Sequence, residues 1–302
     1  MKLFTHTDLD GIGCAVLAKL AFGDNVDISF CNYDEINTNV KEFFDGNTGD
    51  VCHITDISIN EELAEKIDKS EKLYYLFDHH PTALGLNKYN WCKVEIEDIT
   101  SNIKTSGTEL YYKWLIDENC LEKSDVLGRF VEIVRNYDTW RWAALGEEGI
   151  ICKQINDLLY LYGRDNFINW CITEINKNIF PKFEEKENLI LSIKQKEIDD
   201  YVEEKNKQLF ISSLCGKTCG FIFAEKYFSE LGNRLCNLHP EIDFIAMINM
   251  DGFISYRTIK EDINLGKDIA QLFGGGGHPK AAGSQFSKTI QQEIIKQIFK
   301  GD

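Results

Sequence analysis

Residues 73–81 read Leu-Tyr-Tyr-Leu-Phe-Asp-His-His-Pro, an apolar run that ends in a carboxylate and two imidazoles. Two other apolar runs end in a similar way: residues 1–4 precede His-Thr-Asp-Leu-Asp-Gly at 6–11, and the weaker copy 51–56 ends at Asp56. Ligands of open α/β sheets bind at the carboxyl ends of the strands. The three runs therefore predict an α/β fold with a site at that edge of a parallel sheet. Histidines mixed with carboxylates suit a divalent metal such as Mn²⁺.

The residues His6, Asp8 and Asp10 alternate in the sequence. Side chains two residues apart in an extended segment point to the same side, so the spacing predicts that all three face one metal cluster. Two metal ions about 3.5–4 Å apart can clamp the attacking and leaving oxygens of a phosphoryl displacement. Each segment taken alone has another interpretation. Residues 6–10 would be a polar turn or helix cap, and Asp56 would be the N-cap of the next helix. Residues 78–80 would be an exposed loop. The joint occurrence of the three segments favours the metal site.

Length and composition restrict the class of protein. The 302 residues fit one large or two medium domains. No run approaches the roughly 18 apolar residues of a membrane span, and no export signal is recognisable. We therefore expect a cytoplasmic protein without a membrane partner, in which the ten cysteines are reduced. Cys215 and Cys219 are close in sequence but lack a second ligand pair, which disfavours a zinc site.

The formal net charge of -16 comes from 33 basic and 49 acidic residues. A chain this acidic is not expected to bind long duplex nucleic acid, because that binding depends on a broad basic surface. A short anionic substrate remains compatible with the charge, since metal ions and a few arginines can neutralise a small site locally.

Strands and helices alternate in the first half of the chain. Helical patterns cover 11–22, 60–68 and 106–119, which predicts βαβ units and a parallel sheet. Residues 124–177 are mostly helical in pattern, with interruptions near 136–142 and 146–149. The charged segment 183–208 lacks glycine and proline and predicts a long helix that connects two domains. The alternative is an ordinary surface helix of a single domain.

The pattern changes after residue 209. Four strands are expected, the last two flanking the hairpin signal Asp251-Gly252: 209–214, 220–224, 244–249 and 253–258. Helices are expected at 226–237 and 266–273. The predicted organisation is a parallel-sheet domain over 1–182, a helical connector over 183–208 and a smaller α/β domain over 209–302.

A glycine-rich segment, Gly-Gly-Gly-Gly-His-Pro, occupies residues 274–279. Consecutive backbone N–H groups in such a turn can form an anion-binding concavity, and glycines let a phosphate approach the backbone closely. A helix starting after Gly275–Gly277 would add the favourable end of its dipole. A glycine run by itself would be a flexible loop.

These segments together resemble the motifs of the DHH phosphoesterases: His6-x-Asp8-x-Asp10, Asp56 and Asp78-His79-His80. Residues 274–283 resemble the glycine-rich signature of the associated DHHA1 domain. The two signatures occur in the expected order and cover nearly the whole chain. Within this superfamily, length, motif spacing and the connector are most similar to the short oligoribonuclease branch, the nanoRNases of the oligoribonuclease B type.

The resemblance implies two metal positions: His6 and Asp8 for one, Asp10, His79 and Asp138 for the other, and Asp56 as a bridge between them. Asp138 lies in the segment 136–140 and would otherwise belong to a polar turn between helices. Many relatives place more residues between the first histidine and the Asp-x-Asp pair than this chain does.

The resemblance also implies catalytic and substrate-binding roles. Asp78 would orient the ring of His79, and His80 would face the substrate phosphate. A phosphate of the substrate would be held by these residues: Arg257, Gly275, Gly276, Gly277 and His278. Arg257 has a planar fork suited to phosphate, although it would otherwise be an ordinary surface arginine. Lys280 and Asn233 are weaker candidates.

The function implied by the resemblance is hydrolysis of short single-stranded RNA or dinucleotides to 5′-mononucleotides, in the 3′ to 5′ direction, by an enzyme with two divalent metal ions. Mn²⁺ is expected in preference to Mg²⁺, and a homodimer is compatible with this function. Two alternatives use the same scaffold: a phosphatase of 3′-phosphoadenosine phosphate and a hydrolase of linear or cyclic dinucleotides. The type of the second domain disfavours a manganese-dependent pyrophosphatase.

Two further alternatives lie outside these substrates. RecJ-like action on long DNA is disfavoured by the acidic charge and by the absence of an extra nucleic-acid domain. A degenerate nucleotide-binding regulator would have lost metal ligands, whereas every expected ligand has a candidate here.

Overall fold

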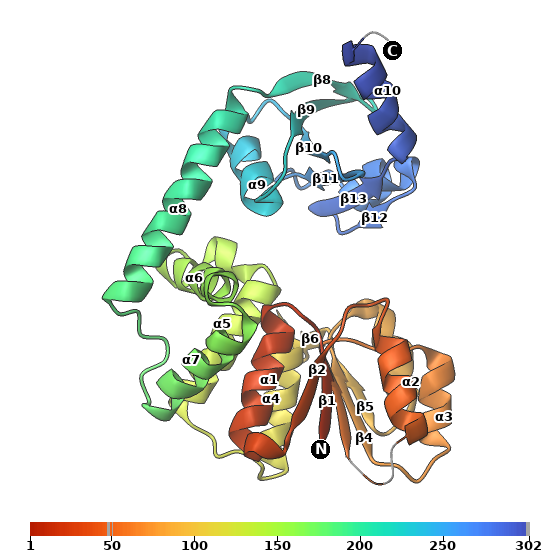
Figure 1. The fold of residues 1–302 in the computed structure, drawn as a ribbon, viewed down its shortest axis with the longest axis vertical. Coiled ribbons are helices and arrows are strands. Elements are labelled where there is room, and N and C mark those ends of the chain that lie inside the picture. The colour runs from red at the N-terminus through yellow and green to blue at the C-terminus, as the bar shows by residue number, and fades with distance from the viewer. Residues whose placement is uncertain (47–48, 50, 300–302) are drawn as a thin grey trace. The chain divides into compact units, whose positions relative to one another are not determined.

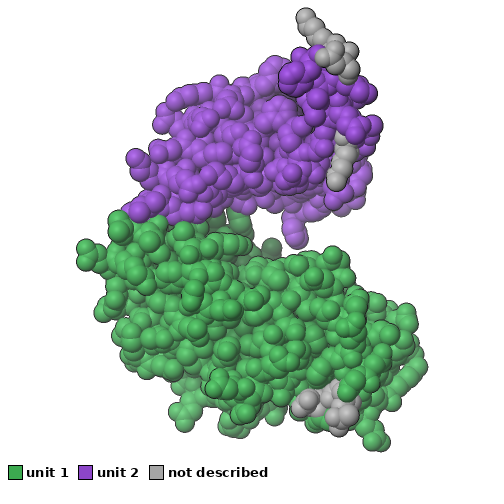
Figure 2. Space-filling view, in the orientation of Figure 1, with its two compact units in different colours: residues 1–191 green, residues 192–302 purple. Residues whose placement is uncertain are grey.

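The computed structural model describes residues 1–46, 49 and 51–299 and divides into two compact units, Met1–Leu191 and Ser192–Asp302 (Figures 1 and 2). Within these described residues, no helix has the length and apolar character needed to cross a membrane.

Unit 1 is built on a parallel sheet of five strands in the order β2-β1-β3-β4-β5 (Figure 1). Their bounds are Lys2–Thr5 for β1, Asp27–Phe30 for β2, Cys52–Thr55 for β3, Tyr74–Asp78 for β4 and Cys92–Val94 for β5. The three strands that the sequence predicts to end at the site, β1, β3 and β4, are direct neighbours, and Thr5 pairs with Thr55 and Thr55 with Phe77. The predicted parallel α/β sheet is confirmed.

Helices cover both faces of this sheet because its strands alternate their buried side chains (Figure 1). Leu3 belongs to the core under α1 (Leu9–Phe22) and α4 (Gly107–Asp117), whereas the next residue, Phe4, belongs to the opposite core under α2 (Ile36–Gly46) and α3 (Glu61–Asp68). Further elements complete the unit: η1 Gly23–Asn25, η2 Pro81–Lys88, β6 Glu97–Asp98, β7 Ile103–Lys104, α5 Asp125–Asp138, η3 Arg141–Ala144, α6 Glu147–Tyr162 and α7 Arg164–Asn176.

The helix expected over 183–208 forms as α8 (Glu185–Asn206), and the division between the units falls within it. Unit 2 contains a six-stranded mixed sheet in the order β12-β13-β11-β10-β9-β8. The strands are β8 Phe210–Leu214, β9 Lys217–Phe223, β10 Phe244–Asn249, β11 Phe253–Arg257, β12 Gly276–Gly277 and β13 Ala281–Gln285. Helix α9 (Phe228–Leu238) packs on one face, and η4 (Leu265–Ile269) with η5 (Ala270–Phe273) on the other. Helix α10 (Lys288–Phe299) follows β13.

The sequence pattern does not predict β2, α2, β5, the β6–β7 pair or α10. Most of these elements are short, as in β6 and β7, but α10 has a helical apolar pattern that the sequence analysis did not identify. The predicted hairpin at Asp251-Gly252 forms between β10 and β11, which pair antiparallel from Asn249 opposite Phe253 onward.

The expectation of a helix start after the glycines is wrong. Gly276 and Gly277 form β12 instead, which pairs with Gly283 and Ala282 of β13. A Cβ atom at Gly275 would lie 2.0 Å from the carbonyl oxygen of Gly283. Gly275 and Gly277 therefore permit a close approach between two backbone segments, whereas a Cβ at Gly276 would meet nothing within 4 Å.

Gly11 provides a test of how tightly α1 is seated. A Cβ atom there would lie 2.2 Å from the carbonyl oxygen of His6. We expect Gly11→Ala to lower the free energy of unfolding by about 1–3 kcal/mol, the cost of forcing extra volume into a packed site. The matched control is Gly128→Ala in α5, where a Cβ meets nothing within 4 Å, and where alanine should add about 1 kcal/mol of helix stability. Urea unfolding followed by circular dichroism measures both, and an undiminished stability of Gly11→Ala would contradict this packing.

Candidate functional site

The loop after β1 brings three candidate ligands to the edge of the sheet. β1 ends at Thr5, and Asp8 is the N-cap of α1, where its carboxylate accepts a hydrogen bond of 3.2 Å from the Gly11 N–H. Asp10 lies in the first turn of that helix. The expectation that His6, Asp8 and Asp10 share one side of an extended segment is therefore wrong. They are grouped because the strand turns into a helix at this point.

Asp56 follows β3 directly and is 1% exposed. Its φ angle of 56° lies in the left-handed region, which is uncommon for residues other than glycine. Gly107, at the start of α4, lies against it, and a Cβ there would be 2.6 Å from the Asp56 Cβ. Asp56 is not the N-cap of α3, because Asn60 has that role and accepts a hydrogen bond from the Leu63 N–H.

The two oxygens of Asp56 face two different imidazoles. Oδ2 lies 3.8 Å from His6 Nδ1, and Oδ1 lies 3.3 Å from His79 Nε2. His6 Nδ1 is also 2.9 Å from Asp8 Oδ2. His6, Asp8 and Asp56 thus form one group that could hold a metal ion, with ligand atoms within 4.8 Å of one another.

A second group gathers around His79, which follows β4. Its Nε2 lies 3.4 Å from Oδ2 of Asp138, the last residue of α5, and 3.7 Å from Asp10 Oδ2. Asp10, His79 and Asp138 could also hold a metal ion, with their ligand atoms again within 4.8 Å. The structure therefore brings together all six residues that the sequence suggested as metal ligands.

The side chains of this cluster are better suited to binding divalent cations than to forming hydrogen bonds with one another. His6 Nδ1, Asp56 Oδ2 and His79 Nε2 are all buried. Each lies near an atom of opposite charge, but none forms a hydrogen bond with acceptable geometry among the described residues. Buried polar atoms in proteins almost always have a partner. Unpaired imidazole nitrogens beside carboxylate oxygens are the ligand set that suits a borderline or hard divalent metal.

The pKa shifts within the cluster are also compatible with cation binding. Burial raises the pKa of Asp56 well above the usual range of an aspartate, and the neighbouring Asp10 and Asp8 raise it further. Burial likewise raises the pKa of Asp138, with the same two carboxylates adding to the effect. Burial lowers the pKa of His79 and so favours the neutral imidazole, the form that binds metals. Without a cation nearby, the repulsion between these carboxylates is relieved by protonation.

Asp10 is the best-anchored carboxylate of the cluster. It is 1% exposed, and its two oxygens accept hydrogen bonds from the Gly107 N–H at 2.6 Å and the Thr108 N–H at 2.9 Å. Both donors are at the N-terminus of α4, where backbone N–H groups and the helix dipole favour an anion. The helix therefore fixes this carboxylate beside His79.

Asp78 orients His80 and not, as the sequence suggested, the ring of His79. Its Oδ1 lies 2.7 Å from His80 Nδ1 and accepts a hydrogen bond of 2.7 Å from the backbone N–H of His79. Ser58 also donates a hydrogen bond to Asp78. Burial alone would lower the pKa of His80, but the hydrogen bond and charge of Asp78 outweigh it, so the pKa of His80 is raised.

Tyr33 joins this site although sequence reasoning did not identify it. Its hydroxyl lies 3.2 Å from His80 Nε2, and its ring centroid is 5.0 Å from that of His6. The side chain is 58% exposed. The signal was available, since Tyr33 follows β2 at the same edge of the sheet as the other candidates, but β2 itself was not predicted.

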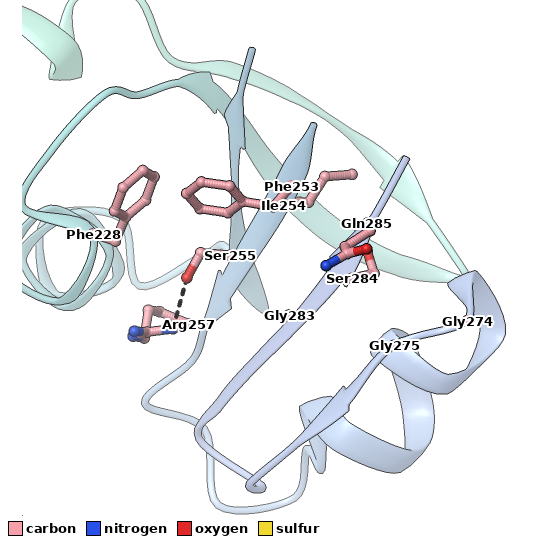
Figure 3. Close-up of a pocket in the computed structure, with 10 residues that line it drawn as sticks. All are labelled: Phe228, Phe253, Ile254, Ser255, Arg257, Gly274, Gly275, Gly283, Ser284 and Gln285. Atoms are coloured by element: carbon pink, nitrogen blue, oxygen red, sulfur yellow. Dashed lines mark hydrogen bonds between the residues drawn. The ribbon is translucent and has the colours of Figure 1, made fainter. Parts of the chain in front are cut away.

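Unit 2 contains a pocket of about 660 Å³, lined in part by Phe228, Phe253, Arg257 and Gly275 (Figure 3). Of the predicted substrate-binding residues, Arg257 and Gly275 belong to the lining. Three others are exposed and are not part of it: Gly276, Gly277 and His278.

Three N–H groups of the glycine segment are not free to bind an anion. The N–H groups of Gly274, Gly275 and His278 already donate to backbone carbonyls, at 3.2, 2.8 and 2.8 Å. The weaker candidates do not line the pocket either: Lys280 pairs with Glu261 at 3.1 Å, and Asn233 donates to the Ser229 carbonyl at 2.8 Å.

Comparison with known proteins identifies the family. No protein-family model matches the chain. Oligoribonuclease NrnB of Bacillus subtilis (strain 168) is 34% identical over 99% of this chain and 76% of its own length. The chain belongs to the oligoribonuclease NrnB family. Uncharacterized protein R106 of Acanthamoeba polyphaga mimivirus is 22% identical over 82% of this chain and 55% of its own length.

Solved structures share the fold of this NrnB-family chain. The pGpG-specific phosphodiesterase PggH of Vibrio cholerae superposes with a TM-score of 0.54 at 15% identity, covering 100% of this chain and 99% of that one. Exonuclease RecJ bound to manganese superposes with a TM-score of 0.59 at 12% identity, covering 98% of this chain and 88% of that one. The α/β architecture inferred from the sequence is thereby confirmed.

Asp56 is the residue on which the metal assignment can be tested most directly. Mutations of outer-shell partners of metal ligands typically cost about 10- to 100-fold, so the loss of a carboxylate that contacts both groups should cost more. We expect Asp56→Asn to lower phosphodiesterase turnover by more than about 100-fold and to reduce the bound metal measured by mass spectrometry. Its melting temperature in chelator should not fall, because asparagine keeps the shape of the buried aspartate and carries no charge. Asp45→Asn on the exposed surface of α2 is the control, and full turnover by Asp56→Asn would refute the assignment.

Tyr33 tests the geometry around His80. Tyr33→Phe keeps the ring against His6 and removes only the hydroxyl that meets His80 Nε2. One such hydrogen bond is worth about 1 kcal/mol, so kcat should fall by about fivefold while the metal content stays unchanged. A loss of metal in Tyr33→Phe would show instead that the hydroxyl supports the metal groups.

Proposed function

We propose that this protein is a metal-dependent phosphodiesterase that degrades short oligoribonucleotides. The observation that carries the proposal is the meeting of six histidine and aspartate side chains around three buried, unpartnered ligand atoms, in a chain 34% identical to an oligoribonuclease over nearly its whole length. We also propose the division of labour suggested by the sequence: residues 1–182 for catalysis, 183–208 as connector and 209–302 for substrate binding.

Two divalent cations are proposed, one held by His6 and Asp8 and the other by Asp10, His79 and Asp138, with Asp56 between them. When bound, they would activate a water molecule and neutralise charge on the scissile phosphate. The mixture of imidazole and carboxylate ligands favours Mn²⁺ over Mg²⁺, because Mg²⁺ prefers an all-oxygen shell with several waters. The likeness of the fold to a RecJ bound to manganese is compatible with this choice.

The protein's own contribution is to hold these groups in place and to present a proton donor. Asp10 is fixed by two backbone N–H groups of α4, and Asp56 by the turn after β3. Asp78 holds the Nδ1 side of the His80 ring, which leaves Nε2 toward Tyr33 and the substrate side. The raised pKa of His80 favours a protonated imidazole. We propose that this imidazolium donates a hydrogen bond to a phosphate oxygen.

The proposed direction is removal of 5′-mononucleotides from the 3′ end. In that reaction the water attacks the terminal phosphodiester, and the 3′-oxygen of the preceding nucleotide leaves, so that the phosphate stays on the released nucleotide. Such a reaction needs no general recognition of a long strand, in keeping with a net charge of -16.

A substrate series tests the function. Purified protein with Mn²⁺ is incubated with 5′-labelled RNAs of two to about twenty nucleotides, chosen because phosphate contacts accumulate with length, and in parallel with 3′-phosphoadenosine phosphate and pyrophosphate. We expect the fastest turnover on the shortest RNAs, with labelled products that shorten one nucleotide at a time. The Asp56→Asn protein is the control for contaminating nuclease. A clear preference for 3′-phosphoadenosine phosphate or pyrophosphate would replace this function by another on the same metal site.

A further inference from the structure

Three helices of unit 1 are followed by a residue with a left-handed backbone. In α4, α5 and α7 the second residue after the helix has a φ angle between 58° and 64°: Asn119, Trp140 and Asn178. Each of them donates its backbone N–H to a carbonyl three residues earlier, at 3.0, 3.1 and 2.8 Å. This is the position at which helices usually carry glycine and sometimes asparagine.

Trp140 is the exception among these three residues. Asparagine tolerates the left-handed conformation, whereas the Cβ of other L-residues makes it unfavourable. For a bulky residue such as tryptophan, a φ of 64° is a genuine outlier. Residues held in unfavourable backbone conformations cluster at active sites and ligand-binding sites. The helix end itself therefore gives no reason for a tryptophan here.

Burial of the ring does not account for this tryptophan either. The chain has five tryptophans, all among the described residues of unit 1: Trp91, Trp114, Trp140, Trp142 and Trp170. Trp140 is the only exposed one, at 44%. Its ring meets that of Trp142 edge to face, with centroids 5.3 Å apart at 69°, and Trp142 is stacked on Tyr137. The indole of Trp140 is thus supported by aromatic neighbours but still open to solvent.

The position of Trp140 in the chain places it beside the metal groups. It follows Asp138 by two residues, a separation that spans at most about 7 Å. Asp138 belongs to the group that it forms with Asp10 and His79. Lys104 is also close enough to act on Asp138 electrostatically. A cation site and a basic side chain beside an exposed indole favour a ligand that combines a negative charge with a flat ring over a purely apolar one.

We propose that Trp140 is a stacking surface for one of the two nucleobases that flank the scissile phosphate. The proposal rests on the proposed function, because that function places the phosphate at the cluster to which Asp138 belongs. A nucleobase is only a few bonds from its phosphate, so a ring anchored two residues from a metal ligand can meet it. Stacking on an aromatic ring accepts any base, and it adds affinity that an acidic chain does not gain from charge.

Trp140→Gly separates stacking from a structural role. The change removes the ring and supplies the residue that this backbone favours, so the melting temperature should be unchanged or raised. We expect kcat/KM for the dinucleotide pApA with Mn²⁺ to fall roughly 5- to 150-fold, the range of one base stack. Trp140→Tyr should keep most of the activity. The loss in Trp140→Gly should disappear for one of two dimers in which an abasic ribose replaces either nucleoside.

Asn178→Gly is the matched control, because it makes the same backbone change at the end of α7 and should leave kcat/KM unchanged. Trp140→Asn copies the residue found at this position after α4 and α7, and it serves if circular dichroism shows that Trp140→Gly is unfolded. Wild-type kcat/KM in a folded variant that lacks the ring, or an equal loss on pApA and on both abasic dimers, would overturn the stacking role and leave RNA hydrolysis standing.

Tryptophan fluorescence tests the same contact without turnover. Since all five tryptophans belong to unit 1, their emission reports on ligands bound there. In the Mn²⁺-loaded protein we expect 5′-AMP to quench the emission more than ribose 5-phosphate does, and Trp140→Gly to abolish the difference. This result in a protein that does not hydrolyse short RNA would uphold the stacking site and reject the proposed function. Equal quenching by the two ligands would count against the stacking site.

Discussion

The chemistry of the site in unit 1 is governed by the repulsion between carboxylates that the fold collects at one edge of the sheet. Asp10 and Asp56 are each 1% exposed, and both lie near Asp138 around the ring of His79. A cluster of this kind is unfavourable unless each charge is neutralised or bound. The α4 N-terminus meets this need for Asp10 alone. Asp56 and Asp138 instead face imidazoles, and divalent cations would relieve the repulsion between them.

The sequence predicts where this cluster lies but not which backbone conformations bring its residues together. Apolar runs that end at His6, Asp56 and Asp78 identify the strand ends, since neighbouring parallel strands finish at one edge. The alternation of His6, Asp8 and Asp10 suggests an extended segment, whereas Asp8 caps a helix. That turn is a local feature, because Gly11 packs against the backbone of His6, five positions earlier. The left-handed backbone of Asp56, by contrast, lies against Gly107, fifty-one positions away along the chain.

The glycine segment of unit 2 is one that the sequence identifies but whose packing role it does not predict. A run of glycines followed by His278 fits an anion-binding loop, but several of its N–H groups are already used by backbone carbonyls. What the glycines permit is close packing, with a Cβ at Gly277 falling 2.6 Å from the Cα of Ala282. Arg257, which lines the pocket of unit 2, is instead held by hydrogen bonds to Ser229 and Ser255. That arrangement joins two segments, α9 and β11, and the contact with Ser229 has no local signature.

The overall charge and the two sites are consistent with one another. Long nucleic acids bind through many lysines and arginines that replace counterions along the strand. A chain with a net charge of -16 repels such a polymer over the Debye length of roughly 8–10 Å at physiological salt. Binding must then come from contacts that are short in range and few in number. The compact group of imidazoles and carboxylates, which would hold cations against a single phosphate, would be a contact of this kind. We infer that the acidic surface and the compact sites act together to favour short substrates.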